Sequence, residues 1–127
     1  MKTVFLITRN LLGLIFLVFG LNGFFHFIPM PPPSGVAGQY LGALFVSHYL
    51  VAVFLLQVAG GALLLANRFV ALALVLLGPV IVNILLFHAC MAPEGLPLAL
   101  VVTALWVTVF FSVRNAFAGL WAMAART

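Results

Sequence analysis

The chain has 127 residues, of which 67% are hydrophobic and only 5% are charged. Soluble domains carry about a quarter charged residues, so five basic residues and one acidic residue are too few to coat a water-facing surface. The composition excludes a soluble globular domain and predicts a single-domain integral membrane protein with about four spans, at roughly 20 residues per span. The net charge of +4 comes from scattered basic residues, so it does not indicate nucleic-acid binding.

Four apolar runs are long enough to cross a membrane as helices. The first is not followed by a small-residue cleavage site, so we interpret it as an uncleaved span and not as a signal peptide. The proline-rich stretch 29–33 ends this span, because proline cannot continue a helix. The next run is too long for one upright span and divides into a short interfacial helix over 36–46 and a second span. The expected spans cover residues 4–28, 47–66, 69–90 and 96–118.

The charged residues orient this all-α, four-helix transmembrane bundle. The basic residues all fall at one end of the expected bundle, and these are Lys2, Arg9, Arg68, Arg114 and Arg126. The acidic residue Glu94 falls at the other end. Because positively charged loops remain in the cytoplasm, we expect both the N- and C-termini to be cytoplasmic. The bilayer is then the first partner of the chain, and the bacterial inner membrane its expected location.

Three histidines, His26, His48 and His88, lie near the outward ends of apolar runs. Under the expected topology they share one depth in the bilayer, which folding alone does not require. Imidazole groups form hydrogen bonds and exchange protons near neutral pH, so the three are candidates for a shared cofactor-binding site. Each histidine taken alone is more often an interfacial or satisfied residue than a ligand, so the indication comes from the set of three.

Three carboxamide side chains, Asn22, Gln57 and Asn83, lie within the expected spans. Polar groups in a span cost free energy and usually face the protein interior. Asn22 shares a helix face with His26, four residues away. The carboxamides are therefore either hydrogen-bonding links between helices or further members of the cofactor-binding site.

Small residues and a proline accompany these carboxamides. Gly60 and Gly61 follow Gln57 on the same helix face, where they would let another helix approach closely. Pro79 shares a face with Asn83 and removes a backbone donor, which permits a kink and a small cavity. Catalytic residues are not assigned, no metal site is predicted, and the single cysteine, Cys90, excludes a disulfide within the chain.

Two stretches, 57–69 (QVAGGALLLANRF) and 78–88 (GPVIVNILLFH), together with 20–27 (GLNGFFHF), resemble the DoxX-like family of small membrane proteins. The resemblance covers about residues 10–117 and implies a four-helix transmembrane bundle. Some family members are linked to quinone reduction, including a subunit of thiosulfate:quinone oxidoreductase. Family members often have a glutamate at the position of Gln57, and a glutamine cannot take up or release a proton there.

The resemblance favours a quinone-linked redox protein, with quinone as the cofactor. The sequence has no flavin, nucleotide-binding or Cys-pair motif, so a partner protein would supply the electrons. One alternative is a non-catalytic accessory subunit of a larger membrane redox or energy-converting complex. Another is a haem or chlorophyll-type pigment site with histidine ligands. A small-solute carrier is disfavoured, because the spans offer no charged pathway.

Overall fold

The computed structural model describes residues 1–123, and every regular element within them is helical. In chain order the elements are α1 (Lys2–Phe25), α2 (Gly35–Val46), α3 (Tyr49–Ala66), α4 (Val70–Cys90), η1 (Pro93–Gly95), α5 (Leu96–Ser112) and η2 (Arg114–Trp121). Four segments are long and apolar enough to cross a membrane, namely α1, α3, α4 and η1 together with α5, which confirms the predicted all-α fold with four helices of this kind. Arg126, one of the five basic residues expected at one end of the bundle, lies outside the described residues.

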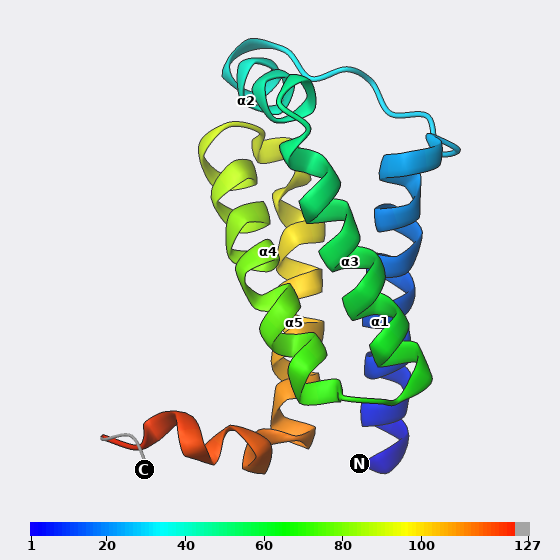
Figure 1. Ribbon diagram of the computed structural model, residues 1–127, viewed down its shortest axis with the longest axis vertical. Coiled ribbons are helices and arrows are strands. Elements are labelled where there is room, and N and C mark those ends of the chain that lie inside the picture. The colour runs from blue at the N-terminus through cyan, green and yellow to red at the C-terminus, as the bar shows by residue number, and fades with distance from the viewer. Residues whose placement is uncertain (124–127) are drawn as a thin grey trace.

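The four long helices form an antiparallel bundle in which α1 packs on α3, α3 on α4, α4 on α5, and α5 on α1. Figure 1 shows α2 lying across one end of this bundle, with the N-terminus and η2 at the opposite end. At that opposite end Lys2 and Arg9 border one depression together with Asn67 and Ser112. The basic residues of the described chain therefore gather at one end, as the sequence predicted.

The contact between α1 and α3 depends on glycine. A Cβ atom on Gly61 would lie 2.6 Å from the backbone nitrogen of Leu17 and 2.7 Å from the carbonyl oxygen of Gly13. The space beside Gly60, where a side chain would lie, is filled by the side chain of Leu77 from α4. The prediction that Gly60 and Gly61 permit close helix approach is thus confirmed. The backbones of α1 and α3 touch where a larger side chain would separate them.

A buried apolar core runs along the bundle. Its fully buried large side chains are Leu12, Leu64, Leu74, Leu77 and Val109. Trp106 on α5 stacks against Phe110, and its Nε1 donates a hydrogen bond to the Leu74 carbonyl oxygen at 3.1 Å. Large apolar side chains on the outer helix faces stay exposed, as expected for surfaces in contact with lipid.

The fourth long helix is shorter than the expected span 96–118. It ends at Ser112, and the chain then turns into η2, which projects sideways from the end of the bundle (Figure 1). Phe117 in η2 is buried and packs against Phe110 of α5 with ring centroids 5.0 Å apart. The chain after Ser112 is therefore held to the bundle through Phe117 and does not extend the helix, while Leu120 and Trp121 stay exposed.

Candidate functional site

Two cavities lie in the half of the bundle that is covered by α2. The central cavity, about 720 Å³, has walls from α1, α3, α4 and α5. The lateral pocket, about 620 Å³, lies between α3 and α4 beneath α2. Phe54, Gln57 and Ile84 border both. Both volumes suit a small organic molecule, for which protein sites typically measure about 300–1,000 Å³.

The central cavity brings together four of the residues singled out from the sequence. Asn22, His26, Gln57 and His88 all line it, among apolar side chains such as Phe16, Phe19 and Val102. An apolar cavity with a few converging polar groups is the usual form of a small-molecule site.

The His88 imidazole is held in one orientation. Its Nδ1 atom lies 3.0 Å from the Ala92 carbonyl oxygen, which can only accept a hydrogen bond. Nδ1 therefore carries the hydrogen, and in the neutral ring Nε2 is left as an acceptor. The ring packs directly on Gly95, where a Cβ atom would overlap it. The loop after α4 thus fixes both the position and the tautomer of His88.

Asn22 shapes the end of α1. Its Oδ1 accepts a hydrogen bond from the Ile28 backbone nitrogen at 2.7 Å, while its carbonyl oxygen accepts one from the His26 nitrogen at 2.8 Å. His26 adopts a left-handed conformation with φ 52°, which ends α1 at Phe25. The side-chain bond of Asn22 is therefore made within its own helix end and not to another helix. Within residues 1–123 its amide NH2 group donates no hydrogen bond and remains free for a ligand.

Gln57 is the deepest polar residue of the site. It is 8% exposed, and its amide forms no hydrogen bond with any residue of the described chain. Gly20 on α1 makes room for it, because a Cβ atom there would lie 3.0 Å from the Gln57 Cβ. The amide therefore faces the two cavities with both its donor and its acceptor capacity unused.

The remaining two predicted residues lie elsewhere. His48 occupies the junction between α2 and α3 in a left-handed conformation, is exposed and lines neither cavity. Asn83 lines the lateral pocket. The structure thus brings His26 and His88 to one cavity, and it does not bring His48 to them.

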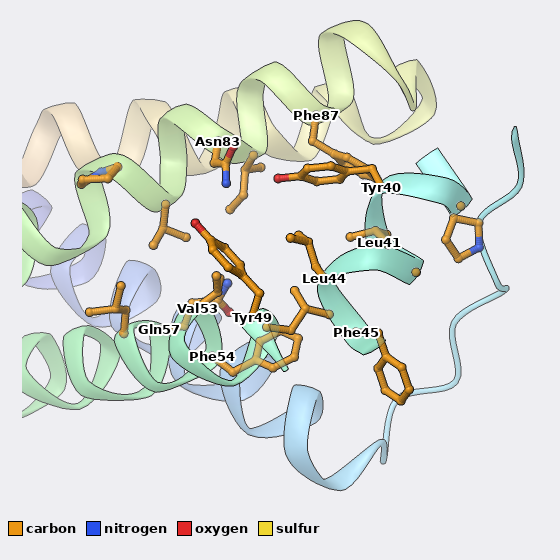
Figure 2. A pocket seen from close by; sticks show the side chains of 18 residues that line it. Tyr40, Leu41, Leu44, Phe45, Tyr49, Val53, Phe54, Gln57, Asn83 and Phe87 are labelled. Atoms are coloured by element: carbon orange, nitrogen blue, oxygen red, sulfur yellow. The ribbon is translucent and has the colours of Figure 1, made fainter. Parts of the chain in front are cut away.

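Two tyrosines that the sequence pattern did not single out, Tyr40 and Tyr49, line the lateral pocket. Figure 2 shows their hydroxyl groups and the Asn83 amide pointing into it. Tyr40 lies in the middle of α2 and Tyr49 is the first residue of α3, so both lie at the end of the bundle. Tyrosine is enriched at membrane interfaces, and that preference was the available signal.

Comparison with models of protein families, with curated proteins and with solved structures finds no match for this chain.

Proposed function

We propose that this chain is a membrane protein of DoxX-like type that binds a quinone in its central cavity and acts in a redox process with a partner protein. The observation that carries the proposal is the convergence of Asn22, Gln57 and His88 on one apolar cavity, with unused hydrogen-bonding capacity on each. His26 borders the same cavity from the end of α1.

The donors and acceptors suit a ring that carries two oxygen atoms. The amide NH2 groups of Asn22 and Gln57 can donate to quinone carbonyl oxygens. The free Nε2 of His88 can accept a hydrogen bond from a quinol hydroxyl and can take up its proton. A bound quinone supplies the two-electron, two-proton redox chemistry, and the chain positions the ring and handles protons.

Gln57 has a positioning role in this scheme. A carboxamide cannot exchange protons near neutral pH, so proton transfer belongs to the histidines that line the cavity. The electrons have to come from a partner, because the sequence contains no motif for an electron-carrying group.

The proposed orientation follows from charge. The gathering of basic residues at the end opposite α2 supports cytoplasmic termini in a bacterial inner membrane. The cavity would then open toward the outer face, with α2 lying in the membrane interface above it.

The test is quinone binding by the full chain, purified gently with whatever co-purifies. Co-purifying quinone is extracted and quantified, and a decyl-tailed benzoquinone is then titrated into the protein in lipid nanodiscs. Loss of one hydrogen bond weakens binding by roughly threefold to tenfold, so His88→Ala and Gln57→Leu should each raise the Kd by about that factor.

A matched pair of histidine variants provides the control. His26 and His48 are both exposed and both left-handed, with φ 52° and 63°, but His26 alone of these two borders the cavity. Asparagine tolerates this backbone conformation, so His26→Asn should weaken binding and His48→Asn should not. Equal effects of the two substitutions, or no quinone binding by the wild-type chain, would contradict the proposal.

A further inference from the structure

The lateral pocket carries its own set of polar groups. Gln57 and Asn83 contribute carboxamides from α3 and α4, while Tyr40 and Tyr49 contribute phenol hydroxyls. No Lys, Arg, Asp, Glu or His side chain borders the pocket. Its ligand is therefore neutral, because a charged group buried here would find no opposite charge.

These polar groups have no partners within residues 1–123, because none of the four side chains forms a hydrogen bond there. Gln57 is more than nine-tenths buried, Tyr40 is half-buried, and Tyr49 and Asn83 are exposed along the open side of the pocket. A buried amide that lacks a hydrogen bond costs free energy, and the hydroxyl and amide groups around Gln57 border the same pocket. The pocket therefore has the form of a site whose hydrogen bonds are completed by a ligand.

The depth of the polar groups restricts the ligand further. In Figure 2 the hydroxyl groups of Tyr40 and Tyr49 point away from α2, toward the part of the pocket bordered by Asn83 and Gln57. The part next to α2 is apolar and includes Leu41 and Leu44. A glycerolipid keeps its polar head at the membrane surface, so it would place the wrong end here. A small ring whose oxygen atoms can enter the hydrocarbon region fits this arrangement.

Aromatic side chains complete the pocket walls. Tyr40 lies against Phe87 with ring centroids 5.8 Å apart, and Phe45, Tyr49 and Phe54 lie on the other sides. Aromatic walls favour a flat ring through stacked and edge-to-face contacts.

We propose that the lateral pocket is a second binding site, distinct from the central cavity, for a neutral, lipid-soluble ring that bears carbonyl or hydroxyl oxygens and an apolar tail. The ring oxygens are hydrogen-bonded by Tyr40, Tyr49 and Asn83, which border only the lateral pocket. Gln57 borders both sites. The ligand class is shared with the proposed function, but the residues tested below belong to the lateral pocket alone.

The positions of the methionines allow the two sites to be told apart. Chemical cleavage at Met30, Met91 and Met123 separates residues 2–30, 31–91 and 92–123. All residues of the lateral pocket fall within 31–91, whereas the central cavity also has walls from the other two fragments. Label that a photoreactive probe on the ring leaves in 2–30 or 92–123 therefore reports the central cavity. Label in 31–91 can come from either site, so the part of it that is lost when Tyr40, Tyr49 and Asn83 are replaced reports the lateral pocket.

The experiment uses the full chain in lipid nanodiscs and a decyl-tailed benzoquinone with an azide on its ring. We expect labelling of 31–91 to fall, by up to about tenfold, in the triple variant Tyr40→Phe, Tyr49→Phe and Asn83→Leu, which removes several hydrogen bonds and keeps the aromatic rings. Labelling of 2–30 and 92–123 should not change in that variant. The matched control is Asn115→Leu, which replaces an exposed asparagine of η2. This variant should be labelled like the wild type.

The outcomes separate this proposal from the one for the central cavity. If His88→Ala loses the labelling of 2–30 and 92–123, the probe has left the central cavity. That result does not contradict the lateral site. The lateral site is overturned if labelling of 31–91 is unchanged in the triple variant or is absent from the wild type. It is also overturned if a decyl-tailed phenyl azide without ring oxygens labels 31–91 equally well, because the pocket would then recognise only apolar surface.

Discussion

At the scale of single residues, Arg9 does more than add a charge to the basic end of the bundle. Its Nη1 donates a hydrogen bond of 2.6 Å to the Leu64 carbonyl oxygen in the last turn of α3. The Leu64 carbonyl oxygen also accepts a hydrogen bond of 3.2 Å from the Asn67 backbone nitrogen, and a cation near the end of a helix complements the helix dipole. Arg9 therefore joins α1 to the end of α3 in a partly buried position.

We predict that Arg9→Met lowers the free energy of unfolding by about 2 kcal/mol, the range for a hydrogen bond to a charged group. Methionine keeps the apolar stem, so the loss reports the guanidinium. Unfolding by a denaturing detergent, followed by circular dichroism, provides the measurement. Arg68→Met removes the same charge from an exposed position at the same end and should cost much less. Equal losses would show that charge alone is responsible.

Gly95 controls His88 through its lack of a side chain. Its backbone φ of −91° suits any residue, so alanine at this position changes only the space available to the imidazole. We predict that Gly95→Ala displaces the ring and breaks its bond to the Ala92 carbonyl oxygen. Nitrogen-15 NMR of labelled histidine should show protonated Nδ1 in the wild type and a mixture of tautomers in the variant. Gly119→Ala, with open space around its Cβ position, should leave the His88 signal unchanged.

At the scale of the helices, the α1–α3 crossing decides which side chains reach the central cavity. Gly61→Ala would push a methyl group into the backbone of Leu17 and Gly13, which cannot move without shifting α1. We predict a loss of about 1–3 kcal/mol in the free energy of unfolding, as for other overpacked sites. Quinone binding should weaken as well, because Asn22 and Gln57 sit on these two helices.

The matched control for that substitution is Gly78→Ala in α4. The nearest atom to its Cβ position is Trp106 Cζ2 at 3.8 Å, an ordinary contact. Alanine is the better helix former, so this variant should be neutral or more stable by up to about 1 kcal/mol. Equal destabilisation by both alanines in a detergent unfolding titration would show that the glycines act through backbone conformation and not through helix approach.

The helix boundaries separate what a local pattern can and cannot predict. The short helix expected over 36–46 matches α2 closely, because prolines precede it and the apolar pattern changes after it. The fourth span ends earlier than expected, because Phe117 packs on Phe110 and turns the chain. That contact is tertiary, whereas the local apolar sequence up to Phe117 predicts that the helix continues.

At the scale of the whole molecule, Cys90 tests the proposed orientation. It is exposed at the end of α4, next to the loop that carries Glu94 and opposite the basic end. We predict that a membrane-impermeant maleimide added to intact spheroplasts labels Cys90. In a Cys90→Ser background, Asn115→Cys at the other end should react only after the membrane is permeabilised. The reverse pattern would mean that the termini lie outside.

The sequence by itself determined the membrane class, the number of apolar helices and the end at which the charges gather, because length, hydropathy and charge are properties of each segment. It also marked four of the polar residues that line the central cavity. Only the tertiary structure decided that His88 and His26 share that cavity, that His48 stays outside it, and that Asn83 joins the two tyrosines in a second pocket. The physical reason is that the depth of a residue in the bundle does not fix the direction in which its side chain points around the helix axis, so residues at one depth can face different neighbours. The direction each one faces is set by its angular position on its own helix and by which helices pack against that face.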